Sequence, residues 1–599
     1  MDYENSSPTS HSARYKPLVD ADLETEPGEL RWALRCVTVA PGHGSEPVRC
    51  KLVDFTLGRA QQTYEALSYT WGDRMDQATI HLDDKPLDVT KNLETALRCL
   101  RRPRAERLLW VDAICVDQSD VAEVNLQVQR MWAIYQYASR VVVFLGEEKA
   151  DSVQAVALVE AIAKDVKVGD YDRITSMLNV MKAKSSRLAL QRLMRSPWWS
   201  RAWVVQEFSV AAAVVFVCGS VEMSSEVFGK ALEVLLDYRF NAVIPPRQEY
   251  FMREIAATPI SHLWTARKEY QATKPTLPKR VPLSLLYRFR GFGASDPKDK
   301  VFSLFHIMGE IAALRPDYTR SVRDLFKDIV RTSIELSDGL QILCHHNRMG
   351  KSTLDLPTWC PDWSIKRGQR ILLWQNGYTA GGDSKPVARF EEDKLWLQGK
   401  LLDRIQWLVS FEPKVFRNKG LLFDQIKTIE ARIVQQGISQ RGEGASSVPS
   451  LESFHRTIVG SRVRERGPQH GAIVLGECDA EMYWDAWHEQ MIAAPHDALH
   501  GKAKVYNDAI YSALAGRSFF ATEKGHIGLA DNPADAGDVV GVFPGSRVLF
   551  CLRETTSRPP RAVGGSEDRF ELIGECYLHG FMDGEAASGD EDTSSLCLI

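Results

Sequence analysis

The stretch RLLWVDAICVDQSDVAEVNLQVQRMWAIYQYASRVVVFLG (residues 107–146) predicts the architecture of the N-terminal part of the chain. Its start, Arg107–Val116, is apolar enough for a buried strand, and Asp120 and Glu123 have the spacing of a helix-capping box. Apolar residues then recur at helical spacing, and Ser139–Gly146 is the continuous apolar run of a strand that is covered on both faces. A strand, a helix and a second strand with short connections predict a parallel sheet.

Neighbouring segments extend this pattern in both directions. YEALSYTW (Tyr64–Trp71) predicts an earlier strand, and AAAVVFVCG, which ends at Gly219, predicts a later one. We therefore expect residues 29–225 to form a flavodoxin-like α/β domain, in which helices cover both faces of a parallel sheet. A mostly helical insertion is expected at 147–196.

The rest of the chain divides by composition into four further regions. Polar and acidic sequence predicts a disordered N-terminal tail and a flexible C-terminal tail. Apolar residues at helical spacing predict a helical region, and short alternating segments between turns predict strands. The expected regions are a disordered tail at 1–28, a mainly helical region at 226–350, an α+β region at 351–585 that ends in a small antiparallel β-barrel, and an acidic flexible tail at 586–599.

Charge and cysteine usage exclude several classes of protein. Lys and Arg number 74 against 78 Asp and Glu, so we expect no nucleic-acid surface. The longest aliphatic run, Val210–Gly219, is about half of a membrane span, and no signal peptide is expected at the N-terminus. The 11 scattered cysteines lack a C-x-x-C pair, which favours a cytoplasmic protein with free thiols and no metal site.

Familiar nucleotide and nucleophile motifs are missing. The chain has no Gly-rich dinucleotide loop, no P-loop and no G-x-S-x-G elbow. Cys115 with a histidine could form a thiol nucleophile, but a small apolar residue at a strand end is the favoured interpretation. Because ligands of parallel α/β sheets bind at the carboxyl ends of strands, we expect a site where Gly72-Asp73, Cys115–Gln118 and Gly146-Glu147 share one rim.

The segment SPWWSRAWVVQEF (residues 196–208) is the most specific candidate for a site. On a helix, Trp199, Trp203 and Glu207 share one face, and a carboxylate beside indole rings loses hydration, which raises its pKa unless a cation compensates. Two interpretations stand. Glu207 either acts in a site or pairs with Arg201 or another arginine at the helix surface while the tryptophans fill the core.

Asp112 also allows two interpretations, because it lies within an apolar segment. It either anchors a loop by accepting hydrogen bonds from backbone amides, which is favoured, or contacts a ligand. Trp71 and Trp110 are better explained as core residues than as surfaces on which a ligand stacks.

These segments together resemble the fungal heterokaryon-incompatibility (HET) domain. The resemblance depends on YEALSYTWGD, LLWVDAICVDQSDVAEVNLQVQRMWAIYQYASRVVVFLGE and SRAWVVQEF, and covers about residues 64–210. The family usually reads DAICINQ, whereas this chain has Asp117, which adds a charge. Downstream segments such as ASDPKDKVFSLFHIMG and LPTWCPDWS resemble large proteins of the same group.

HET domains in turn resemble Toll/interleukin-receptor (TIR) domains more distantly. SRAWVVQE is similar to the TIR helix that carries W-x-x-x-E, in which the glutamate cleaves the nicotinamide–ribose bond of NAD. The resemblance implies NAD as a substrate, with no further cofactor, and Glu207 as the catalytic residue. It implies substrate contacts from the strand-end and helix residues Trp71, Gly72, Asp73, Asp112, Asp117, Gln118 and Trp203.

The resemblance implies a role in non-self recognition that triggers regulated cell death, with NAD hydrolysis as its chemistry. An alternative is a non-catalytic interaction module that acts by assembly with a protein partner or by self-association. Trp198 and Trp199 would then be interface anchors. A family member that has lost both activities is a third interpretation.

Overall fold

The computed structural model forms two compact units, each of which is described by itself. Unit 1 comprises Met1–Pro278 and Phe292–Arg320, and unit 2 comprises Lys279–Gly291 and Ser321–Ile599. The expected helical region at 226–350 is therefore not a unit of its own, because its residues pack into both. The structure describes residues 15–18, 32–58, 63–147, 151–179, 183–242, 244–273, 283–309, 311–336, 339–345, 352–365, 373–440, 449–463, 473–475, 477–493, 499–555, 569–587 and 593–599.

The centre of unit 1 is a sheet in the order β5-β4-β2-β1-β6-β3-β7-β8-β9. Its middle strands β6, β3, β7 and β8 run parallel, as expected, whereas β1 and β9 pair with this core antiparallel. The α/β class is confirmed, with a mixed sheet in place of a wholly parallel one. The strands are β1 (Trp32–Val39), β2 (Arg49–Leu57), β3 (Glu65–Ser68), β4 (Gln77–Leu82), β5 (Lys85–Thr90), β6 (Arg107–Trp110), β7 (Val141–Phe144), β8 (Val214–Cys218) and β9 (Val221–Ser224).

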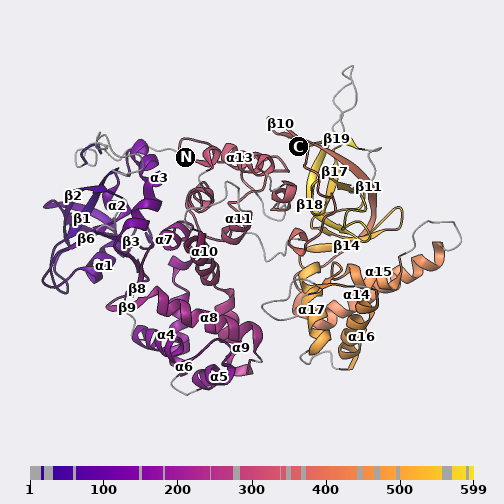
Figure 1. Ribbon diagram of the computed structural model, residues 1–599, viewed down its shortest axis with the longest axis horizontal. Helices are drawn as coiled ribbons and strands as arrows, with labels where there is room; N and C mark the ends of the chain where they lie inside the picture. Colours follow the sequence, from indigo (N-terminus) through magenta and orange to yellow (C-terminus); the bar gives the residue numbers. More distant parts are fainter. Residues whose placement is uncertain are drawn as a thin grey trace. The chain divides into compact units, whose positions relative to one another are not determined.

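The helices of unit 1 lie around this sheet and at one end of it. Helix α1 packs against β4 and β5, and α3 packs against α7. Helices α4, α5, α6, α8 and α9 gather beyond β8 and β9 (Figure 1). The helices are α1 (Lys91–Leu100), α2 (Asp112–Cys115), α3 (Val121–Tyr137), α4 (Ser152–Asp165), α5 (Tyr171–Asn179), α6 (Ala183–Met194), η2 (Pro197–Ser200), α7 (Val204–Val210), α8 (Ser225–Asn241), α9 (Pro246–Ala257), α10 (Ile260–Thr273), α12 (Asp299–Phe302) and η3 (Ala312–Leu314).

Two local expectations near the site are corrected. The apolar segment from residue 107 is not one strand, because β6 ends at Trp110 and the chain turns into α2 at Asp112. The segment from residue 196 is not one helix, because η2 ends at Ser200 and α7 begins at Val204. At both breaks the backbone changes direction between two elements. The apolar residues continue across each break, so the local pattern did not show it.

Only half of the predicted capping box before α3 is present. The Asp120 carboxylate accepts hydrogen bonds from the amides of Ala122 and Glu123, as an N-cap should. The Glu123 side chain instead forms an ion pair with Arg35 at 2.6 Å. This buried pair ties the start of α3 to β1.

Unit 2 contains a closed β-barrel. The strands follow the order β11-β14-β15-β18-β17-β16, and β16 pairs again with β11, so the sheet closes on itself (Figure 1). The expected antiparallel barrel is confirmed. The strands of unit 2 are β10 (Ala388–Glu391), β11 (Lys394–Ser410), β12 (Arg462–Val463), β13 (Ile473–Val474), β14 (Arg517–Thr522), β15 (Ile527–Asp531), β16 (Val539–Val542), β17 (Leu549–Glu554), β18 (Arg569–Leu578) and β19 (Ser594–Leu598).

Helices accompany the barrel in unit 2. Helix α17 packs against β14, and α16 packs against α15 and α17. The helices are α11 (Leu283–Phe289), α13 (Val322–Glu335), η4 (Gly339–His345), η5 (Leu373–Asn376), η6 (Val415–Arg417), α14 (Lys419–Gln440), α15 (Leu451–Thr457), α16 (Glu477–Ala493) and α17 (Gly501–Leu514). No helix in the described residues has both the length and the apolar composition of a membrane span.

Both predicted tails are partly ordered. Residues Ser594–Leu598 form β19, which pairs with β11 and β18 and buries Leu596, Cys597 and Leu598, so a flexible tail is wrong there. At the other end, the Tyr15 hydroxyl donates a hydrogen bond to the Ile114 carbonyl at 3.1 Å. Apart from residues 15–18, the predicted tail at 1–28 lies outside the described residues.

Candidate active site

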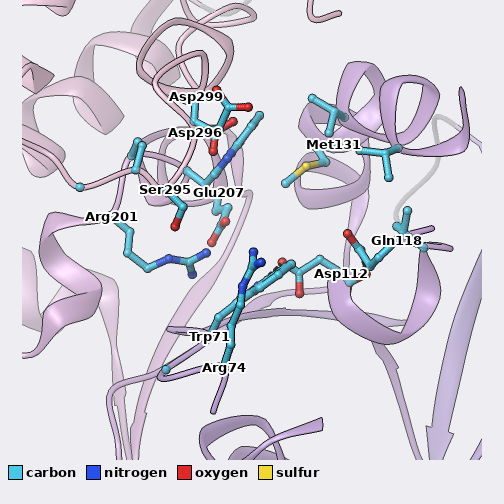
Figure 2. A pocket seen from close by; sticks show the side chains of 18 of the residues that line it. Trp71, Arg74, Asp112, Gln118, Met131, Arg201, Glu207, Ser295, Asp296 and Asp299 are labelled. Atoms are coloured by element: carbon cyan, nitrogen blue, oxygen red, sulfur yellow. Dashed lines mark hydrogen bonds between the residues drawn. The ribbon is translucent and has the colours of Figure 1, made fainter. Parts of the chain in front are cut away.

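A cavity of about 880 Å³ lies in unit 1 beside the carboxyl ends of β3 and β6. Its volume falls within the range of roughly 300–1,000 Å³ that is typical of small-molecule sites. Four segments form its wall: the loop after β3, the segment from the end of β6 through α2 into α3, the segment from η2 into α7, and residues 293–318 (Figure 2). The end of β7, which was expected at the same rim, does not line this cavity in the described structure.

The cavity brings together seven of the eight site residues that were predicted from the sequence. They are Trp71, Gly72, Asp73, Asp112, Gln118, Trp203 and Glu207. The exception is Asp117. Its carboxylate accepts hydrogen bonds from the amide and the hydroxyl of Ser119, at 3.0 and 2.6 Å, and so shapes the turn before α3.

The loop after β3 supplies three of these residues. Trp71 is partly exposed, although a core position was favoured for it. Gly72 has φ 79°, a left-handed conformation that favours glycine, and lets the chain turn directly after the indole. The exposed Asp73 accepts a hydrogen bond from the Met75 amide at 2.9 Å, which stabilises the turn.

Glu207 is buried in the wall of the cavity, with 2% of its surface exposed. The Ser68 hydroxyl donates a hydrogen bond to Oε2 of Glu207, and the same hydroxyl accepts one from Nε1 of Trp198 at 2.7 Å. Burial raises the pKa of Glu207 to about 7, although Arg201 and the Ser68 hydrogen bond oppose that rise. The carboxyl group is therefore held in one orientation and titrates near neutral pH.

Arg201 lies near Glu207 without neutralising it. The two side chains form no ion pair, and the Arg201 guanidinium donates instead to the Tyr69 carbonyl. Figure 2 shows both side chains pointing toward the middle of the cavity. Glu207 is thus part of the cavity wall, and its pairing with an arginine at the helix surface is not observed.

Asp112 anchors a turn, as favoured, and it also lines the cavity. Its Oδ1 accepts a hydrogen bond from the Ala113 amide at 2.7 Å, and its Oδ2 accepts one from Nε1 of Trp71 at 2.8 Å. Burial raises its pKa, while Arg201 and Trp71 oppose the rise. Asp112 thus anchors the turn into α2 and also presents a carboxyl group at the cavity, where Gln118 donates to its backbone carbonyl at 2.9 Å.

The neighbouring tryptophans have separate roles. Trp198 and Trp199 are 0% and 1% exposed, so neither is a surface anchor for a partner, contrary to the alternative interpretation. Trp199 stacks on Phe228 with ring centroids 5.4 Å apart. Trp203 is partly exposed and lines the cavity, and its side chain opposes the rise that burial causes in the pKa of Asp299.

One wall of the cavity was missed by the sequence analysis. The Gly293 carbonyl accepts a hydrogen bond from the Ala202 amide at 2.9 Å, which places residues 293–299 beside the start of α7. Within this segment, Asp299 accepts a hydrogen bond from the Tyr318 hydroxyl at 2.6 Å, and burial raises its pKa to about 6. The sequence analysis identified this segment only by its resemblance to large proteins of the same group, which did not show where it would pack.

Two further polar side chains in the cavity wall were also missed. The Arg74 guanidinium lies 5.6 Å from the centroid of the Trp71 ring and forms no ion pair within the described residues. Gln127 is 2% exposed, and neither atom of its side-chain amide has a hydrogen-bond partner in the described protein. Leaving a buried polar group unpaired costs ~1–3 kcal/mol.

Comparison with known families assigns both ends of the chain. Residues 64–207 match the model of the heterokaryon incompatibility protein (HET) family, and residues 478–597 match the Het-6 beta-barrel domain. The chain therefore contains one region that is similar to the HET domain and another that is similar to the Het-6 barrel. The first match contains the ends of β3 and β6, helix α3 and Glu207. The second match contains most strands of the barrel.

A curated relative extends this similarity over nearly the whole length. Heterokaryon incompatibility protein 6, OR allele, from Neurospora crassa is 25% identical over 630 aligned residues. The alignment covers 88% of this chain and 90% of the relative. No solved structure matches the chain.

Proposed function

We propose that this protein acts in heterokaryon incompatibility as a cytoplasmic NAD hydrolase whose activity triggers regulated cell death. The observation that carries the proposal is the buried carboxyl group of Glu207, which Ser68 orients at the wall of a ligand-sized cavity. The distant resemblance to TIR domains, in which a W-x-x-x-E glutamate cleaves NAD, supports the same assignment. Trp203 and Glu207 hold those two places in this chain.

The chemistry would break the bond between C1′ of the ribose and the nicotinamide nitrogen. The bonding electron pair leaves with nicotinamide, positive charge develops on the ribose, and water adds to C1′ and releases a proton. An ionised Glu207 would stabilise that positive charge, as carboxylates do in glycoside cleavage. The cationic nicotinamide ring of NAD would itself favour the ionised form of Glu207.

Other groups in the cavity suit the remainder of such a substrate. Arg74 and Arg201 provide guanidinium groups for a diphosphate, which arginine binds with good geometry. Figure 2 shows these two guanidinium groups facing the middle of the cavity. Trp71 and Trp203 provide aromatic surface for planar rings.

We further propose that a protein partner or a second copy of the chain controls this activity. Non-self recognition requires a protein that distinguishes partners, and unit 2 carries the Het-6 barrel that the family model recognises. Assembly without catalysis stands as the competing hypothesis. Under that hypothesis Trp198 and Trp199 cannot be the contact residues, because both are buried in unit 1.

Expression of the full chain in yeast tests the proposal. A fragment such as 29–225 would omit the cavity wall at 293–299, so the whole chain is required. The unchanged protein should lower cellular NAD and viability, and Glu207→Gln should abolish both effects at equal protein levels. Glu160→Gln, which alters an exposed carboxylate on α4, is the matched control and should remain toxic. Toxicity that persists in Glu207→Gln would favour assembly without catalysis.

A further inference from the structure

Gln127 is a buried side chain whose hydrogen-bonding capacity the protein does not use. It lies on α3, is 2% exposed and lines the cavity, and both its amide nitrogen and its amide oxygen have no partner in the described residues. Buried amides in folded proteins are almost always paired. An unpaired amide in a cavity wall therefore indicates a group that a ligand supplies.

We propose that Gln127 determines substrate specificity by pairing with a planar edge that offers one hydrogen-bond donor beside one acceptor. This inference rests on the proposed NAD hydrolysis. A glutamine amide carries both a donor and an acceptor, so it forms a reciprocal pair with such an edge. NAD presents two of them: the carboxamide of nicotinamide and the amino edge of adenine, which glutamine also reads in DNA.

The surroundings of Gln127 make this pairing selective. Its neighbours in the cavity wall on α3 are Val124, Val128 and Met131, all apolar. A hydrogen bond is stronger in apolar surroundings, and a mismatched group there leaves both partners unpaired. A carboxylate in place of the carboxamide, or a carbonyl in place of the amino group on the N6/N7 edge of adenine, leaves that edge with acceptors only. An oxygen would then face the Gln127 oxygen, and the analogue would bind more weakly.

Gln206 provides an internal comparison. It is also fully buried with an unpaired amide in the described structure, but it does not line the cavity. Gln206→Leu therefore removes the same chemical group at a place that a ligand does not contact. It controls for any general effect of losing a buried amide.

The test measures ligand binding in a full-length Glu207→Gln background, in which turnover does not interfere. Calorimetry gives the Kd for NAD, for nicotinic acid adenine dinucleotide and for nicotinamide hypoxanthine dinucleotide. We expect NAD to bind at least about tenfold more tightly than one of the two analogues. The analogue that binds more weakly identifies the edge, carboxamide or adenine, with which Gln127 pairs. Gln127→Leu should remove the preference, and Gln206→Leu should keep it.

The outcomes separate the inference from the proposed function. If the unchanged protein releases nicotinamide from NAD but Gln127→Leu keeps the full preference, the inference on Gln127 is wrong and the hydrolase proposal stands. The inference on Gln127 is equally wrong if NAD and both analogues bind equally well. If NAD neither binds nor is cleaved, both proposals fail. Thermal unfolding of each variant shows that a lost preference is not lost folding.

Discussion

Ser68 and Glu207, 139 positions apart in the chain, are joined by a hydrogen bond from the serine hydroxyl to the glutamate carboxyl group. Ser68 is the last residue of β3, and Glu207 lies in α7, so the bond connects a strand end to the helix beside it. Trp198 donates to the same hydroxyl. The carboxyl group in this aromatic segment is thus held by a neighbouring strand, and its orientation does not depend on a helical stripe.

Replacing Ser68 by alanine should weaken catalysis and shift its pH dependence. The Ser68 hydrogen bond lowers the pKa of Glu207, so its loss should move that pKa above 7 and reduce the ionised fraction at neutral pH. A hydrogen bond to a charged group contributes roughly 1.5–3 kcal/mol, so kcat should fall about tenfold or more. The measurement is the pH profile of nicotinamide release. Ser139→Ala, outside the cavity, should leave the profile unchanged.

The activity of the unchanged protein should rise with pH. In the proposed mechanism the reaction needs the ionised Glu207, and the pKa of about 7 for this group then places half of the maximal rate near neutral pH. The rate should be low at pH 5 and nearly full at pH 8. A rate that is constant or falls between these values would show that the ionised form of Glu207 is not required.

The same pKa predicts a change in stability with pH. Because the folded protein raises the pKa of Glu207 from 4.5 to about 7, the folded state holds a proton that the unfolded state has lost between these values. Glu207 therefore stabilises the fold fully below pH 4.5, and this contribution is lost as the pH rises through 7. At 1.36 kcal/mol per pH unit the effect is about 3 kcal/mol.

Glu207→Gln should remove this dependence. The free energy of unfolding of the variant, relative to the unchanged protein, should increase from pH 5 to pH 8. Denaturant unfolding at the two pH values gives the difference, and Glu160→Gln supplies the control. Identical pH dependence in Glu207→Gln and the unchanged protein would contradict a raised pKa at this residue.

The C-terminal strand should be essential for the stability of the barrel. Leu598 is fully buried where β19 pairs with β11 and β18, so Leu598→Ala should cost about 2–5 kcal/mol. Leu421→Ala, at a side chain that is 48% exposed, should cost less than about 0.5 kcal/mol. Thermal unfolding measures both. Equal melting temperatures would mean that β19 does not stabilise the barrel in solution.

Sequence patterns were sufficient to predict a helix or strand where one or both of its faces are buried. The apolar runs at β7 and β8 predicted the parallel core, and the alternation near the C-terminus predicted the barrel. The rule that ligands bind at strand ends placed Asp112 and Gln118 in the cavity wall.

Features that depend on contacts between distant segments were beyond prediction. The break between η2 and α7 follows from pairing with Gly293, and nothing in the local sequence indicates that partner. The same contact brings Asp299 to the site. The apolar end of β19 is too short to stand out, and it becomes a strand only because two barrel strands pair with it. Asp117 does not line the 880 Å³ cavity, and the local sequence did not show that its side chain completes a turn.

The most direct test of the account is nicotinamide release from NAD by the purified full-length protein, compared with that by Glu207→Ala. We predict that the unchanged protein produces equal amounts of nicotinamide and ADP-ribose, and that Glu207→Ala, although folded, produces neither. Release at the same rate by both proteins, or no release by the unchanged protein, would contradict the central claim.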